Sequence, residues 1–171
     1  MRKLLGAASI LLACFWAALG RLRDKKQSIA HLHALAQSLL ELRSALQERQ
    51  QGLGGMFLSL AQKYEKGPVR GFYGRLNEKL EDLGEYSFSE LWRGTAEECF
   101  SALGEGVVDI LCPLGDCLGG SELDRQCAAL ERAAQRIEKE AETRREALGG
   151  EKRLSFGLSL CAGGFLAIML M

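Results

Sequence analysis

Hydrophobic and charged residues are strongly segregated along this chain. Residues 4–20 (LLGAASILLACFWAALG) and 154–171 (LSFGLSLCAGGFLAIMLM) contain no charged side chain, whereas every acidic residue lies between Asp24 and Glu151. As a helix, each uncharged segment extends about 25–27 Å at about 1.5 Å per residue, which is the short end of a membrane crossing. The pattern predicts transmembrane helices at 1–20 and 154–171. Basic residues that can reach the bilayer surface flank both segments: Arg21, Arg23, Lys25, Lys26, Lys152 and Arg153.

The first apolar segment also has features of a cleaved signal peptide. Arg2 and Lys3 form a basic start, residues 18–20 (ALG) form a small-x-small site, and Cys14 follows a lipobox-like LLA. The residues after Cys14 stay apolar, which is atypical of a lipoprotein signal, and the C-terminal segment has no processing signature. A retained helix is therefore favoured, and processing of the first segment is left as the alternative.

The basic flanks indicate an orientation. Four Lys or Arg residues directly follow the first segment, two directly precede the second, and none follows the second. The positive-inside rule then places residues 21–153 in the cytosol, although Arg2 and Lys3 act in the opposite direction.

Two long helices are predicted to follow and precede the apolar segments. An apolar stripe indicates a helix that runs unbroken from the first segment to about Gln50, where Gly52, Gly54 and Gly55 end it. After a cap at Ser121 and Asp124, a 4-3 apolar spacing broken only by Arg144 indicates a second long helix that pairs with the first. The first stripe contains Ile29, Leu32, Leu35, Ala36, Leu39, Leu42 and Leu46, and the second contains Leu123, Cys127, Leu130, Ala134, Ile137, Ala141 and Leu148.

Shorter amphipathic segments lie between these two helices. We expect helices at 56–64, at 68–83 with Leu83 facing inward, and after a capping box formed by Ser87 and Glu90. A further apolar helix at 107–118 is expected to be interrupted by Pro113, and no segment alternates as a strand does. The predicted fold class is all-α: a long antiparallel helical hairpin with a small helical bundle, flanked by N- and C-terminal transmembrane helices. The domains are then 1–20, 21–153 and 154–171.

The region between the apolar segments is acidic. Residues 27–151 contain 14 basic and 21 acidic side chains, which leaves a net charge of −7. Nucleic-acid binding depends on neutralising phosphates with basic side chains, so this function is disfavoured. Carboxylate pairs on polar helical faces are instead candidates for contact with a protein partner: Glu81, Asp82, Glu97 and Glu98.

The sequence contains no pattern that indicates catalysis. Phosphate-binding, dinucleotide-binding and zinc-protease motifs are absent, and His31 and His33 point in different directions on one helix. Cys112 and Cys117 have no matched second pair, as a zinc site of this type requires. We therefore predict no enzyme, catalytic residue, cofactor, metal or small-molecule substrate. A thiol-based activity at Cys112 and Cys117 is the one enzymatic alternative.

Small residues recur at intervals of four in both apolar segments. This spacing allows close helix packing in lipid, and an antiparallel pair would bring Cys14 and Cys161 to similar depth. The transmembrane packing candidates are Ser9, Ala13, Ala17, Ser159, Gly163 and Ala167.

From end to end, the sequence resembles the stage III sporulation protein AB family. The resemblance is carried by residues 3–6 (KLLG) before an apolar run, 87–92 (SFSELW) and 114–119 (LGDCLG) before the helix that Ser121 begins. It continues through Gln126, Leu130 and Glu131 to the tail at 152–170. The family's Tyr-Gly-x-Thr-Pro-Leu-like segment is replaced here by residues 50–56 (QQGLGGM), so contacts of that loop are not transferred.

The resemblance implies a membrane protein of a transenvelope channel between mother cell and forespore. Its soluble domain is similar to the F-type inner-membrane platform domain of type II secretion systems, which is all-helical. The implied location is the forespore outer membrane, with the soluble domain facing the mother-cell cytosol. The implied partners are the lipid bilayer and other stage III A-operon proteins, including a cytosolic secretion-type ATPase, and a homo-oligomer is compatible with this role. The function expected is a non-enzymatic platform that docks the ATPase. A membrane-anchored coiled-coil adaptor or a lipoprotein unrelated to sporulation is the alternative.

Overall fold

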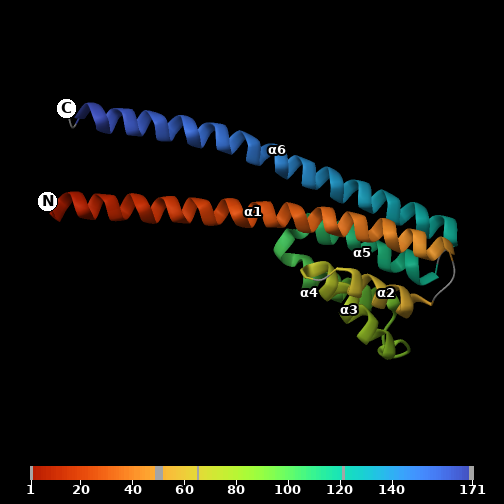
Figure 1. The fold of residues 1–171 in the computed structure, drawn as a ribbon. Coiled ribbons are helices and arrows are strands. Elements are labelled where there is room, and N and C mark those ends of the chain that lie inside the picture. The colour runs from red at the N-terminus through yellow and green to blue at the C-terminus, as the bar shows by residue number, and fades with distance from the viewer. Residues whose placement is uncertain (1, 49–51, 65, 121, 170–171) are drawn as a thin grey trace. The chain divides into compact units, whose positions relative to one another are not determined.

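The structure is a computed structural model that describes the backbone of residues 2–48, 52–64, 66–120 and 122–169. Side chains are described for Gly20 and for residues 23–48, 52–64, 66–120 and 122–149. In these ranges the chain forms α-helices, two short 3-10 helices and no strand (Figure 1). The all-α class is thus confirmed. The chain divides into a helix-pair unit, Met1–Ile29 with Glu142–Met171, and a bundle unit, Ala30–Ala141.

Two long helices run through the sequence of both units. Helix α1 spans Arg2–Glu48 and helix α6 spans Leu123–Met169, so the predicted continuous helices are confirmed. Ser121, the predicted cap of α6, lies outside the described residues. Of the residues that the structure describes, no helical stretch is both long and apolar enough to cross a membrane. The two apolar segments lie almost entirely outside the side chains described, and their insertion in a membrane stays a prediction.

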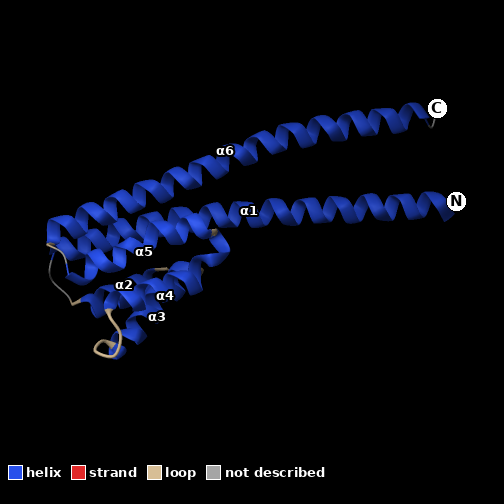
Figure 2. Cartoon of the chain, turned by 180° about the vertical axis from the view of Figure 1, so that it is seen from behind, coloured by secondary structure: helices blue, strands red, loops and turns tan. Residues whose placement is uncertain are grey.

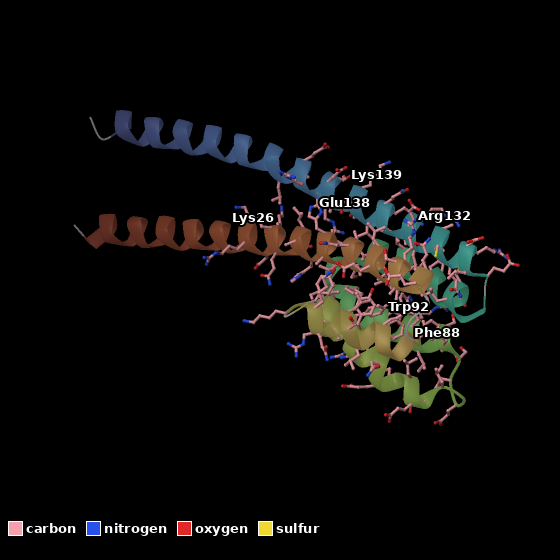
Figure 3. The ribbon with its side chains drawn as sticks, turned by 45° about the vertical axis from the view of Figure 1, so that its right-hand side comes forward. Lys26, Phe88, Trp92, Arg132, Glu138 and Lys139 are labelled. Carbon is pink, nitrogen blue, oxygen red and sulfur yellow. The ribbon has the colours of Figure 1, made fainter. Side chains whose placement is uncertain are left out.

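In the bundle unit, α1 and α6 pack through the predicted apolar stripes. Leu32, Leu35 and Leu39 of α1 are fully buried, as are Leu130 and Ile137 of α6. Polar pairs lie beside this seam: Nη1 of Arg43 is 3.4 Å from Oε2 of Glu131, and Nδ1 of His33 is 2.9 Å from Oε1 of Glu138. Figure 3 labels Glu138 on α6. The 4-3 spacing therefore produced the expected buried interface.

Four shorter helices pack beside α1 in the bundle unit (Figure 1). They are α2 (Leu53–Lys63), α3 (Pro68–Lys79), α4 (Phe88–Phe100) and α5 (Glu105–Gly120). Their core is aromatic: the Phe72 ring centroid lies 4.9 Å from that of Trp92 and 5.1 Å from that of Phe100. The Trp92 indole donates a hydrogen bond of 2.9 Å to the Leu111 carbonyl oxygen, which satisfies the one polar group of this buried side chain.

Three local expectations were wrong. Helix α5 continues through Pro113. Proline has no amide group to donate to the carbonyl oxygen of Asp109, four residues earlier. Because both residues are exposed, this carbonyl oxygen can bond to water instead. Helix α2 begins at Leu53 rather than at residue 56, with Gly54 and Gly55 in its first turn. Leu83, predicted to face inward, lies beyond the end of α3 and is exposed.

Candidate partner-binding surface

The segment between α3 and α4 forms a tight turn that presents its side chains outward. After α3 ends at Lys79, a 3-10 helix spans Leu80–Asp82. The Asp82 carbonyl oxygen then accepts hydrogen bonds from the amides of Glu85 at 3.1 Å and Tyr86 at 3.2 Å. Gly84 has φ 125°, a conformation that residues other than glycine rarely adopt. Figure 2 shows this loop projecting beyond the ends of α3 and α4.

The loop combines exposed acidic and apolar side chains. The structure describes four large apolar side chains that are exposed, and two of them are Leu83 at 47% and Tyr86 at 51%. Glu81, Asp82 and Glu85 are exposed beside them. We call these five residues the acidic tip. Exposed aromatic and apolar side chains rimmed by polar ones are typical of protein interaction sites.

The start of α4 fixes one end of this loop. The Ser87 hydroxyl accepts a hydrogen bond of 3.3 Å from the Glu90 amide, and the Glu90 carboxylate accepts one of 2.9 Å from the Ser87 amide. The predicted capping box is therefore confirmed. Hydrogen bonds from Ser87 lower the pKa of the Glu90 carboxyl, so this carboxylate stays ionised as a cap at neutral pH.

The four acidic candidates separate into two different settings. Glu81 and Asp82 belong to the acidic tip, whereas Glu97 and Glu98 are exposed on α4. The Glu98 carboxylate is 3.1 Å from Nζ of Lys79 and 3.0 Å from Nη1 of Arg75. A hydrogen bond from Lys79 is the main cause that lowers the Glu98 pKa. Glu98 therefore ties α4 to α3, and its charge is balanced by two cations.

The sequence did not single out Leu83, Glu85 or Tyr86 as part of this surface. The pattern at 69–83 predicts one inward-facing stripe, which would place Leu83 in the core. A signal was available, because Gly84 follows Leu83 directly and glycine commonly ends helices in a conformation of positive φ. The helix ends earlier still, at Lys79.

The histidine and cysteine candidates do not converge on one site. The His31 ring lies against Gly67, where a β carbon would be 3.1 Å from Cε1, and His33 pairs with Glu138. Cys112 and Cys117 are partly buried and unbridged, and burial raises the pKa of the Cys112 thiol. Over the part of the chain that the structure describes, no three His, Cys, Asp or Glu residues are grouped to hold a metal ion.

The transmembrane packing candidates cannot be located in the same way. Their side chains lie outside the described residues, and so do those of Cys14 and Cys161. The set comprises Ser9, Ala13, Ala17, Ser159, Gly163 and Ala167.

Comparison with known proteins identifies a family for this chain. Residues 3–171 match the sequence model of the family described as Stage III sporulation protein AB. Among curated proteins and among solved structures, none gives a significant match. The match covers essentially the whole chain, as the resemblance predicted.

Proposed function

This chain belongs to the stage III sporulation protein AB family, and we propose that it is a membrane platform subunit that docks a cytosolic ATPase. In this proposal the apolar segments 4–20 and 154–171 tether it to the forespore outer membrane. The bundle unit faces the mother-cell cytosol as part of a transenvelope, secretion-like complex with other stage III A-operon proteins. Family membership supports the sporulation role, and the tethering rests on the predicted membrane segments.

The acidic tip is the observation that carries the docking part of the proposal. Leu83 and Tyr86 offer exposed apolar area, and the neighbouring Glu81, Asp82 and Glu85 supply negative charge. Interfaces of this composition gain affinity from the apolar anchors and association rate from the charges. The chemistry complementary to the tip is a basic surface with an apolar pocket on the ATPase.

Deletion of the gene in the native host tests the sporulation role. We expect development to arrest after engulfment, and wild-type spore formation in the deletion strain would contradict the proposal. Complementation with the wild-type chain restores spores and supplies the strain in which variants of the tip are compared.

Co-purification of the ATPase with the complementing chain tests the docking surface. We expect the double variants Glu81→Lys/Asp82→Lys and Leu83→Ser/Tyr86→Ser to accumulate normally and lose the ATPase. The control Glu105→Lys/Asp109→Lys makes the same charge change on exposed positions of α5 and should retain it. Retention by both tip variants would exclude the tip as the docking site.

Glu97 and Glu98 should be tested by single variants, because Glu98 contacts cations on α3 that its reversal would lose. Reversal of Glu98 would also break its contacts with Arg75 and Lys79, so lost binding there would not distinguish docking from stability. Glu97→Lys leaves those contacts in place. Loss of the ATPase with Glu97→Lys alone would extend the docking surface along α4.

A further inference from the structure

The outer face of α1 in the bundle unit carries no charge. Five side chains of α1 are exposed between residues 30 and 47, and none of them is acidic or basic. Together with the partly buried His33 they recur at intervals of three and four residues, so they lie along one face of the helix. Leu40 lies near the centre and is 42% exposed. We call the exposed residues of this face the uncharged stripe: Ala30, Gln37, Leu40, Ser44 and Gln47.

The exposed faces of three other helices in the bundle unit are charged. Every exposed side chain of α3 and of α4 is acidic or basic. In α6, five of the seven side chains exposed between residues 124 and 139 are charged, and Figure 3 labels Arg132 and Lys139 among them. In a chain with 26% charged residues, an exposed helical face without charge indicates a covered surface, because the cores of protein interfaces are depleted of charged residues.

Charged side chains that border the stripe are paired within the chain. On the side of α2, Nζ of Lys63 is 2.8 Å from Oε1 of Glu41. On the side of α6, Nη1 of Arg43 is 3.4 Å from Oε2 of Glu131. The stripe therefore has the arrangement of an interface, with an uncharged centre and charges at the rim.

The stripe forms a ridge between two grooves. The groove between α1 and α2 has a volume of ≈ 450 Å³, and the groove between α1 and α6 has a volume of ≈ 530 Å³. Gln37 and Leu40 line both grooves. The exposed side chains of α2 up to Gln62 are uncharged as well, and Ser59 lines the first groove. A ridge beside a groove is the shape on which a second helix packs.

The stripe is complementary to itself. In a two-fold pair of identical chains, a residue near the axis faces its own equivalent, so a charged residue there would meet a like charge. Gln37 and Gln47 carry a donor and an acceptor in one amide group, so each can bond to its equivalent. The Ser44 hydroxyl donates to the Leu40 carbonyl oxygen at 3.2 Å and can still accept a hydrogen bond. Leu40 would meet a second leucine, whereas the charged faces of α3, α4 and α6 would repel their own copies.

The predicted membrane segments set the direction of such a pair. In two copies that insert in one membrane with the same orientation, α1 leaves the membrane on the same side, so the two stripes run parallel. Exposed Lys26 precedes the stripe and exposed Glu48 follows it. The uncharged contact is therefore limited to residues 30–47, which extend about 25 Å along the helix at about 1.5 Å per residue.

We propose that a second copy of this chain covers the uncharged stripe, with α1 packed against α1 in parallel. Leu40 supplies the apolar centre of the contact, and Gln37 and Gln47 fix its register, as buried polar residues do in paired helices. The proposal uses no residue of the acidic tip. It takes the direction of the helices from the predicted membrane insertion and is independent of ATPase docking.

Photo-crosslinking between two tagged copies tests the pairing. Leu40 is replaced by benzoylphenylalanine in a full chain with one tag, and a second full chain carries another tag. Both are produced in growing cells that lack the other stage III A-operon proteins, so no ATPase can bridge them. We expect a light-dependent product that contains both tags, and none when the exposed Ala128 of α6 is replaced in the same way. Position 40 that gives no two-tag product, or that crosslinks only a different protein, would overturn the proposal.

Charges introduced at position 37 test the two-fold register through the same crosslink. Gln37→Glu in both copies, or Gln37→Lys in both, places like charges opposite each other and should lower the yield at least about fivefold. One copy with each substitution should recover at least about half of the original yield, because the charges then attract. This recovery also shows that both variants fold.

Gln62→Glu is the matched control, because it makes the same change at an exposed position of α2. It should change the yield less than about twofold, as expected of a surface substitution away from the contact. Unchanged yields in the like-charged pairs would exclude the stripe as the interface. A mixed pair that accumulates normally and does not recover would overturn the parallel two-fold arrangement.

Discussion

A β carbon added to Gly115 of α5 would lie 3.1 Å from the β carbon of Trp92 on α4 and 3.1 Å from the α carbon of Ser89. Few real β carbons lie this close to a neighbouring atom, so an added β carbon would require α4 to shift by a few tenths of an ångström at this crossing. The close approach places the Trp92 indole within hydrogen-bond distance of the Leu111 carbonyl oxygen. Gly115 therefore permits the close approach of α4 and α5 beside the aromatic core.

Alanine at two helical glycines should change stability in opposite directions. Gly115→Ala forces the α4 backbone to shift and should lower the free energy of unfolding by about 1–3 kcal/mol. Gly74 of α3 has open space where its β carbon would be, so Gly74→Ala should raise this free energy by about 0.5–1 kcal/mol. Urea unfolding followed by Trp92 fluorescence in a Trp16→Phe background measures both. Stabilisation by Gly115→Ala would contradict the close helix crossing.

The capping box should contribute measurably to the stability of the bundle unit. Ser87→Ala removes the hydroxyl that accepts from the Glu90 amide and should cost about 1 kcal/mol in the same unfolding experiment. Ser101→Ala is the control, because Ser101 is exposed and surface substitutions of this kind stay within about 0.5 kcal/mol. Equal effects at the two serines would show that the cap adds nothing.

Two tyrosines predict a loss of stability at alkaline pH. Burial, followed by the negative charge of Glu41, raises the pKa of Tyr64 to about 12 from its ordinary value of 10.0, and burial raises the pKa of Tyr73 as well. Because the folded state favours the neutral phenol, the two tyrosines contribute fully to the stability of the fold below pH 10. This contribution is lost as the pH rises toward 12 and above. Unfolding between pH 9 and 12 should be less pH-dependent in Tyr73→Phe. An identical pH slope in the variant would exclude this cause.

The ion pairs of Glu98 should change its titration more than they change the stability of the fold. The Glu98 pKa lies below the ordinary value of 4.5, first because of the hydrogen bond from Lys79. The stabilisation is therefore present above pH 4.5 and is lost as the pH falls through the lower folded pKa. Lys79→Gln should raise this pKa more than the exposed control Lys66→Gln, as measured by carboxyl NMR. The cost in stability should be below about 1 kcal/mol, since exposed pairs contribute little.

The sequence predicted the long helices better than the details between them. Apolar spacing located Leu32, Leu39 and Ile137 in the interface of α1 and α6, because burial along a helix repeats with the helical period. It did not predict that α5 continues through Pro113, since the tolerance depends on the exposure of Asp109 in the folded state.

The candidate site was predicted only in part, for a related reason. Charge alone identifies Glu81 and Asp82 as candidates for contact with a partner. Charge does not reveal tertiary contacts, so the sequence places Glu98 in the same group although it contacts Lys79 and Arg75. The exposure of Leu83 and Tyr86 depends on where α3 ends and on the turn at Gly84, and an apolar residue just beyond a helix end looks like part of its stripe.

Photo-crosslinking from the acidic tip tests the platform proposal most directly. Leu83 is replaced by benzoylphenylalanine in the full chain, expressed in sporulating cells of the native host, with Asp109 of α5 replaced in the same way as the control. The proposal predicts a light-dependent crosslink from position 83 to the stage III A-operon ATPase and none from position 109. A chain that supports spore formation but crosslinks the ATPase equally from both positions, or only from position 109, would contradict it.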